Sequence, residues 1–96
     1  MITLNLGTRE IFVVDITDKL GAITDLAAVP VDYRVLTEDE ELQVDWTPVN
    51  SKEGMQVYPL IDTTIGVWAE GTYKLYVRPN ISPEAPVLGP IEFGLS

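Results

Sequence analysis

The most specific local pattern in the sequence is Glu70-Gly71-Thr72-Tyr73-Lys74-Leu75-Tyr76-Val77-Arg78. The glycine in its second position is typical of a turn, and apolar side chains then follow at every second residue, at Tyr73, Leu75 and Val77. Alternation of this kind places one set of side chains on a core and the other set on solvent. The stretch therefore predicts a turn followed by a half-buried β-strand.

A period of two recurs along the chain, in short runs that turn residues separate. Residues 2–6 and 42–47 alternate between apolar and polar side chains, which predicts strands with one solvated face. Residues 11–14 and 29–36 are apolar on both sides, which predicts strands that are central in a sheet or covered by a second subunit. We expect residues 11–14 to be central. Further runs complete a set of seven to eight predicted strands: residues 55–60, 63–68 and 87–95.

Many short strands at this spacing indicate an all-β sandwich. A chain of 96 residues is long enough for one core, so we predict a single domain over residues 1–96. The proline-rich stretch 79–86 is expected to be an extended loop that leads to the last strand, residues 87–95. That strand either closes the sandwich or pairs with another chain.

Tyr73 matches one feature of immunoglobulin-like sandwiches. In those domains a tyrosine near the start of strand F hydrogen-bonds back to the backbone of the preceding corner, two residues before a core position. Tyr73 would be this corner residue and Leu75 would fill the core position. The alternative is an ordinary glycine turn in which Tyr73 is a core aromatic. The predicted fold is an immunoglobulin-like β-sandwich of mainly antiparallel strands.

A second pattern lies upstream and reads Asp15-Ile16-Thr17-Asp18-Lys19-Leu20-Gly21-Ala22-Ile23-Thr24-Asp25-Leu26. Together with Gly71-x-Tyr73-x-Leu75-x-Val77-Arg78, it resembles the small immunoglobulin-like domains of tailed-phage virions. Examples are the N-terminal domain of baseplate upper proteins and the minor tail β-sandwich proteins of actinophages. The resemblance implies a non-enzymatic, multi-copy structural protein located in the virion, with other virion proteins and copies of itself as partners. It provides no catalytic residues, and it does not distinguish capsid, neck, tail and baseplate.

Composition and charge exclude several classes of function. Fifteen acidic residues against six basic ones give a net charge of −9, which would repel a nucleic-acid backbone or an anionic membrane. We therefore expect neither nucleic acid nor membrane as a partner. Cysteine and histidine are absent, which removes thiolate nucleophiles, the imidazole base and the commonest transition-metal ligands. The sequence predicts that the protein is not an enzyme.

Carboxylates are the only abundant reactive groups, and they cluster at Glu38-Asp39-Glu40-Glu41. This run lacks the alternating ligand spacing of a calcium loop and the glycine at its sharp turn. Four adjacent carboxylates between two strands are more typical of a solvated turn. We therefore predict no metal site and no cofactor.

Aromatic side chains offer the best candidates for binding. Trp46 is in phase with Leu42 and Val44, which predicts a core position. Tyr76 is out of phase with the core positions of its strand, so it should project outward, where tyrosine and tryptophan favour protein interfaces. Exposed aromatic rings would also suit a carbohydrate-binding or host-surface-binding module, which is the alternative function. The predicted interface residues are Trp68, Tyr76, Tyr58, Ile91, Phe93 and Leu95.

Overall fold

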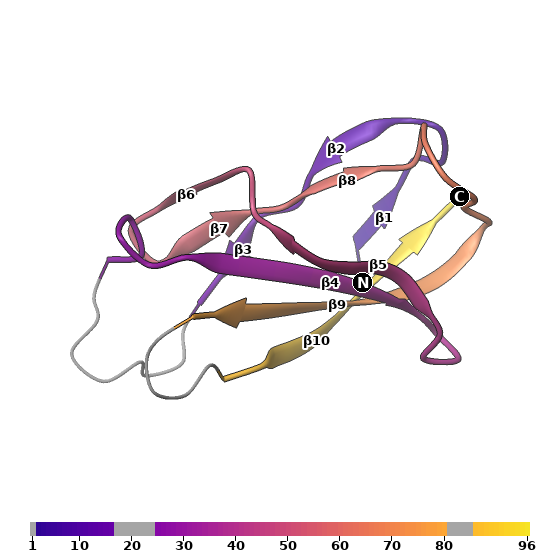
Figure 1. The fold of residues 1–96 in the computed structure, drawn as a ribbon. Coiled ribbons are helices and arrows are strands. Elements are labelled where there is room, and N and C mark those ends of the chain that lie inside the picture. The colour runs from indigo at the N-terminus through magenta and orange to yellow at the C-terminus, as the bar shows by residue number, and fades with distance from the viewer. Residues whose placement is uncertain (1, 17–24, 81–85) are drawn as a thin grey trace.

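The computed structural model describes residues 2–16, 25–80 and 86–96, which form ten short strands in two layers (Figure 1). The strands are β1 (Ile2–Leu4), β2 (Arg9–Ile11), β3 (Val14–Asp15), β4 (Val31–Thr37), β5 (Leu42–Pro48), β6 (Ser51–Glu53), β7 (Gln56–Tyr58), β8 (Leu60–Asp62), β9 (Gly71–Pro79) and β10 (Leu88–Leu95). Within the described ranges no helix is long and apolar enough to cross a membrane. The predicted all-β class is confirmed.

The first layer is a five-stranded sheet in the order β1-β10-β9-β4-β5. Its strands are antiparallel except for β1, which runs parallel to β10. β4 lies between β9 and β5, which confirms a central position for the strand predicted within residues 29–36. β10 pairs with both β9 and β1, so the last strand of the chain is an inner strand of the chain's own first layer.

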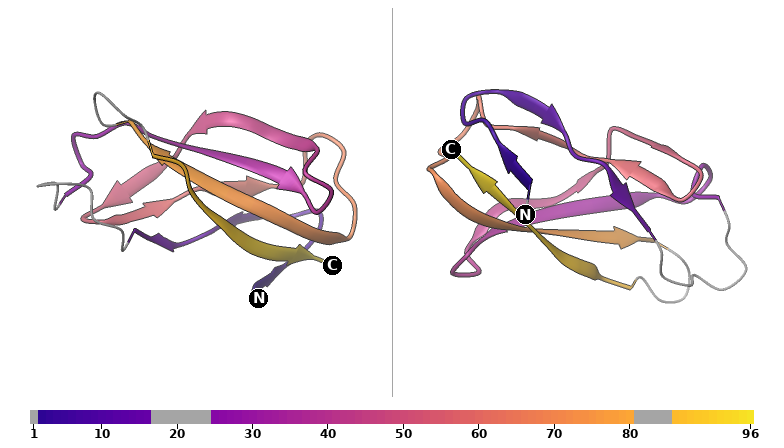
Figure 2. Two further views of the ribbon diagram at one scale, coloured as in Figure 1. Left: turned by 90° about the horizontal axis from the view of Figure 1, so that it is seen from below. Right: turned by 180° about the vertical axis from the view of Figure 1, so that it is seen from behind.

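The second layer consists of two small sheets, β2-β8 and β3-β7-β6, which follow one another along the molecule (Figure 2). Phe12 and Val13 separate β2 from β3, and Pro59 separates β7 from β8. Proline has no N–H to donate, which interrupts a strand ladder at this point. The Phe12 N–H still donates to the Pro59 carbonyl at 2.9 Å. The two small sheets therefore act as one irregular layer.

The core lies between the layers and consists of side chains that alternate along their strands. Its buried hydrophobic members among the described residues are Leu4, Phe12, Val14, Ile16, Leu26, Val31, Tyr33, Val35, Val57, Ile61, Tyr73, Leu75, Val77, Phe93 and Leu95. Phe93 joins the layers, because its ring centroid lies 5.6 Å from that of Phe12 and 5.7 Å from that of Tyr73. Burying one such side chain contributes roughly 1.5–3 kcal/mol.

The corner predicted at Tyr73 is formed. Its hydroxyl donates to the Ala69 carbonyl at 2.8 Å and accepts the Ala69 N–H at 3.2 Å. Leu75, two residues later, is fully buried. The hydroxyl thus satisfies both backbone groups of Ala69 just before β9 begins.

Two strand predictions are wrong. Residues 11–14 are not central: β2 and β3 each pair on one side only among the described strands, and Ile11 is 61% exposed. Residues 63–68 do not form a strand but an irregular connection. Thr63 still extends the β2-β8 ladder, because its N–H donates to the Thr8 carbonyl. The chain then turns, since the Thr64 N–H donates to the Asp62 side chain and Gly66 has a positive φ of 76°.

Two further predictions lie wholly or partly outside the described residues. Residues 17–24, the middle of the pattern at 15–26, are outside them, and so are residues 81–85 of the proline-rich stretch. On either side of that second gap, Pro79 ends β9 and Leu88 begins β10.

Replacing Tyr73 by phenylalanine should lower the free energy of unfolding by about 1–2 kcal/mol, because both hydrogen bonds to Ala69 are lost while the ring remains. Urea denaturation measures the change. The matched control is Tyr76→Phe, since Tyr76 lies on the same strand and its hydroxyl forms no hydrogen bond with a described residue. An equal loss in both variants would contradict a structural role for the corner.

Candidate interaction surfaces

Trp46 lies on the outer face of the first layer, so the prediction of a core position is wrong. β4 and β5 pair Tyr33 with Thr47 and Val35 with Val44. Two steps along β4 thus match three steps along β5, which is a β-bulge. The extra residue reverses the alternation of side chains, so that Val44 packs against the core while Trp46 is half-buried on the opposite face.

Four side chains from β4, β5 and β9 meet on this face, and we call them the arginine-aromatic face: Arg34, Trp46, Tyr76 and Arg78. The guanidinium carbons of Arg78 and Arg34 lie 4.1 Å and 4.8 Å from the centroid of the Trp46 ring. The Arg34 carbon also lies 6.0 Å from the centroid of the Tyr76 ring. Cations are attracted to the negative face of an aromatic ring, so the rings and guanidiniums hold one another in place.

The charges on this face are only partly compensated within the described residues. Asp32 accepts from Arg78 at 3.3 Å and from the Asn80 side chain at 3.1 Å. Lys74 pairs with Glu40 at 3.4 Å. Arg34 forms no ion pair with a described residue, and its Nε atom is buried without a hydrogen-bond partner among them. A protein of net charge −9 therefore gathers two arginines and two aromatic side chains on one sheet face, where Asp32 pairs with Arg78 and Glu92 lies opposite Lys74.

The residues predicted as interface anchors do not gather on one surface. Tyr76 projects outward, as its phase in β9 indicates. Tyr58 lies in the second layer, where its hydroxyl donates to Gln56 Oε1 at 2.7 Å. Trp68 is half-buried against Tyr73, with ring centroids 5.3 Å apart, and its Nε1 donates to the Ile65 carbonyl at 3.0 Å.

The three predicted anchors of the last strand face inward. Phe93 and Leu95 are enclosed in the core of this chain, and Ile91 is half-buried and packs against it. All three belong to β10, whose pairing with β9 turns alternate side chains towards the second layer. They therefore offer no free surface in this structure.

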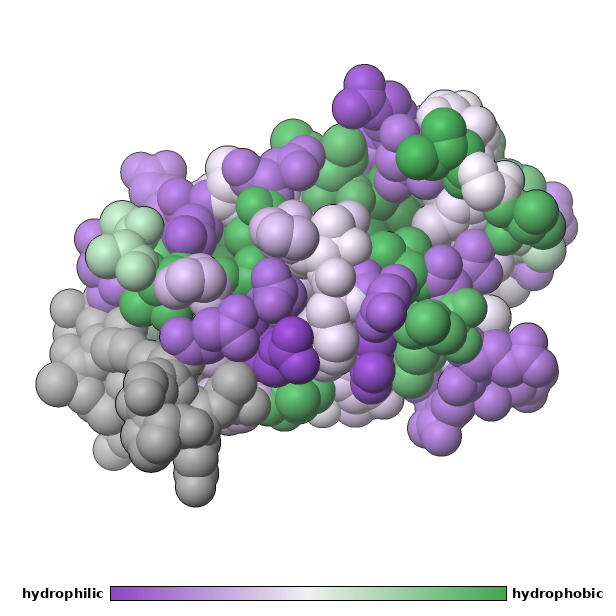
Figure 3. Space-filling model, in the orientation of Figure 1, coloured by the Kyte–Doolittle hydropathy of each residue, from purple (hydrophilic) through white to green (hydrophobic). Residues whose placement is uncertain are grey.

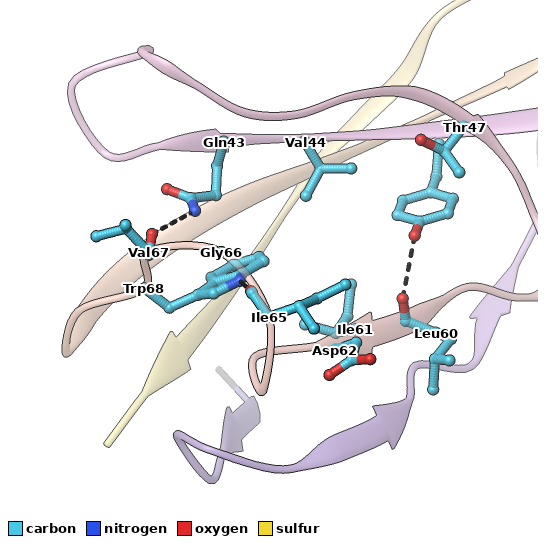
Figure 4. A pocket seen from close by; sticks show the side chains of 11 residues that line it. Gln43, Val44, Thr47, Leu60, Ile61, Asp62, Ile65, Gly66, Val67 and Trp68 are labelled. Carbon is cyan, nitrogen blue, oxygen red and sulfur yellow. Dashed lines mark hydrogen bonds between the residues drawn. The ribbon is translucent and has the colours of Figure 1, made fainter.

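A cleft opens between the two layers, where β5 and β8 face each other (Figure 4). Its volume is about 400 Å³, and it is lined by Tyr33, Gln43, Val44, Thr47, Leu60, Ile61, Asp62, Ile65, Gly66, Val67 and Trp68. Most of the lining is apolar. Figure 4 shows Gln43, Val44 and Thr47 on one side and the residues of β8 and its following connection on the other.

Side-chain to backbone hydrogen bonds hold the walls of the cleft together. The Tyr33 hydroxyl donates to the Leu60 carbonyl at 3.1 Å, and the Gln43 amide donates to the Val67 carbonyl at 2.7 Å. Each bond joins one layer to the other across the cleft. At the rim, Ile65 is 68% exposed and Val67 is 89% exposed, and apolar surface is visible at the end of the molecule where β8 leads towards β9 (Figure 3).

Asp62 is the only carboxylate among the residues that line the cleft. The Thr64 hydroxyl and N–H both donate to it and hold the pKa of this carboxyl below its usual value, and the Arg9 guanidinium at 3.3 Å adds to the effect. Burial raises the pKa of the Tyr33 hydroxyl, and the charge of Asp62 raises it further. Asp62 therefore stays ionised at neutral pH.

The described residues contain no group of three or more acidic side chains placed to hold a metal ion. Comparison with protein families, with curated proteins and with solved structures finds no match for this chain. The arginine-aromatic face and the cleft are therefore the structural features that bear on function. Arg34 and Arg78 were not predicted as site residues from the sequence, although both occupy outward positions, on β4 and β9.

Replacing Thr64 by valine removes the hydroxyl donor and should raise the pKa of Asp62 towards its usual value. An NMR titration of the side-chain carboxyl measures this directly. Because the folded pKa is the lower one, Asp62 contributes stability above the unfolded value of about 3.9, and this contribution is lost as the pH falls through the folded pKa. A second variant, Asp62→Asn, removes the carboxylate itself. It should lower the urea midpoint of unfolding at neutral pH and lower it less at acidic pH. An Asp62 pKa that does not move in Thr64→Val would contradict this assignment.

Proposed function

We propose that the two layers form an immunoglobulin-like sandwich. Variable-type domains of this fold place strand C′ beside C, F and G in one sheet, and B, D and E in the other. The strand order supports this, because β5, β4, β9 and β10 would be C′, C, F and G, and the second layer would supply B, D and E. The corner at Tyr73 then lies near the start of strand F, where such a tyrosine is expected.

The function that we propose is that of a non-enzymatic structural component of a tailed-phage virion, such as a minor tail, neck or capsid-decorating protein. It would act by packing against other virion proteins and copies of itself. The virion assignment rests on the sequence resemblance carried by residues 15–26 and 71–78. The mechanism rests on the arginine-aromatic face.

The arginine-aromatic face suits a protein interface in both composition and geometry. Tryptophan, tyrosine and arginine are the residues most enriched among those that dominate binding energy. Here the guanidiniums of Arg34 and Arg78 are already ordered over the ring of Trp46. Binding would therefore lose less side-chain entropy than it would for free arginine side chains.

The same geometry disfavours carbohydrate stacking. A sugar needs an aromatic ring with a free face, and two guanidiniums lie over the Trp46 ring. Trp68 is half-buried and packs at 53° against Tyr73, so these two rings form no coplanar platform. Protein packing is therefore the better supported of the two functions.

A photo-crosslinker tests the proposal in the assembled particle. Benzoylphenylalanine is placed at Tyr76, and virions are purified from a suppressor host that produces the substituted chain. We expect irradiation to link position 76 to a virion protein or to a second copy. Glu53 on β6 is exposed in the other layer and is the control site. If the chain is missing from purified virions, the virion role is rejected, and equal crosslinking at both sites would reject the role of the face.

Trp46→Ala should sharply reduce incorporation into virions, because it removes the ring that both guanidiniums contact. The two lost cation–π contacts account for about 1–2 kcal/mol of the free energy of unfolding, and the lost burial of the half-buried ring adds to this, so circular dichroism must first show that the variant folds. Quantitative mass spectrometry of purified particles measures the effect. Tyr58→Ala, which removes a half-buried aromatic of the second layer, should leave incorporation unchanged. Normal incorporation of Trp46→Ala would contradict the proposed face.

A further inference from the structure

The cleft lies between two strands that are unpaired on the side facing it. β5 pairs only with β4, and β8 pairs only with β2, among the described strands. Residues from both strands line the same cleft. An edge strand presents N–H and C=O groups that can pair with a further chain. On β5 the Trp46 N–H already donates to the Asp45 side chain at 2.8 Å, and the Asp45 carbonyl accepts from the Thr47 hydroxyl at 2.8 Å, so an added strand would have to replace these two local hydrogen bonds. The seven residues of β5 span about 23 Å at roughly 3.3 Å per residue, which is long enough to pair with a short peptide.

The apolar lining of the cleft continues the core out to the surface. Val44 and Trp68 pack against the buried core, and Ile61 belongs to it. Ile65 and Val67 extend the apolar surface to the rim. A strand added to β5 would direct every second side chain into this space, because side chains alternate between the two faces of a sheet.

Carboxylates belong to the segments that border the cleft or directly adjoin them. Glu41 and Asp45 belong to β5 or directly precede it, Asp62 lies on β8, and Glu70 follows the rim connection. Of these four, only Asp62 forms an ion pair with a described residue, Arg9. The flanks of the cleft therefore favour a cationic partner, as does the net charge of −9.

We propose that the cleft binds an extended segment of a partner protein, which adds to β5 as a strand. The segment would have apolar side chains at alternate positions and lysine or arginine at its ends. Main-chain hydrogen bonds to β5 would provide affinity, and the apolar cleft would select the inward side chains. This inference rests on the proposed function only in taking a protein as the partner, and it uses a surface separate from the arginine-aromatic face.

Peptide selection tests the proposal without knowledge of the natural partner. Random twelve-residue peptides displayed on filamentous phage are selected on the full chain and, in parallel, on the double variant Ile65→Ser, Val67→Ser. We expect the unchanged chain to enrich peptides with alternating apolar residues and basic ends. A synthetic peptide with the enriched sequence should bind the double variant, which we call the cleft variant, at least tenfold more weakly than it binds the unchanged chain. The control variant Ile11→Ser, Val13→Ser replaces two exposed apolar residues of the second layer and should change the affinity less than twofold.

The geometry of strand addition has its own signature. An added strand turns the N–H groups of alternate residues towards β5, so N-methylation of one alternate set should abolish binding while methylation of the other set is tolerated. Hydrogen exchange should slow at the β5 amides when the peptide is bound. The proposal is overturned if no peptide is enriched over the cleft variant, if both methylated sets bind equally, or if exchange slows elsewhere. The two proposals can fail separately. If position 76 does not crosslink but the peptide still binds both the unchanged chain and Trp46→Ala, the proposed function is rejected and this inference is retained.

Discussion

Tyr73 contacts three parts of the molecule: the corner before β9, the core, and the connection at the rim of the cleft. Its hydroxyl holds both backbone groups of Ala69, and its ring lies against Phe93 of the core and Trp68 of the rim connection. The first contact fixes where β9 begins. The second packs β9 against β10, whose Phe93 also contacts Phe12 of the second layer. The third positions one wall of the cleft. Core packing and cleft shape therefore depend on the same side chain.

Local alternation was enough to predict the class of fold and the interior of the main strands. β9 follows a strict period of two, so its inward residues could be assigned from the sequence. β4 buries alternate residues as well, but its sequence is apolar on both sides, and this predicted only a central position. The inward residues of β5 could not be assigned, because its register against β4 shifts twice. The shifts leave Leu42 57% exposed and place Trp46 beside Arg34. A bulge depends on how two strands pair, and this information is absent from the period of either strand alone.

The candidate surfaces were harder to predict because they depend on contacts between distant residues. The connection at residues 63–68 reads as a strand from its composition. Its start is instead anchored by the Gly7 and Thr8 N–H groups, which donate to the Thr63 hydroxyl from more than fifty residues earlier, and the Thr64 N–H then donates to the Asp62 side chain in a local turn. The cleft likewise requires β5 and β8 to be neighbours in space, and the arginine-aromatic face requires Arg34 and Arg78 to lie on adjacent strands. The spacing of residues along the sequence does not reveal which strands become neighbours in space.

The proposed packing against copies of itself would have to overcome the charge of an acidic protein. Two copies of net charge −9 repel each other at long range, but at physiological salt this repulsion is screened beyond about 8 Å. Contacts formed at shorter range then decide whether the copies associate. Arg34, which has no acidic partner among the described residues, and the half-buried Trp46 provide such contacts on one sheet face. The carboxylates beside β5 oppose a like-charged neighbour at the cleft. Under the two proposals each surface would therefore bind a different kind of partner, because carboxylates adjoin the cleft while two arginine side chains lie on the other face.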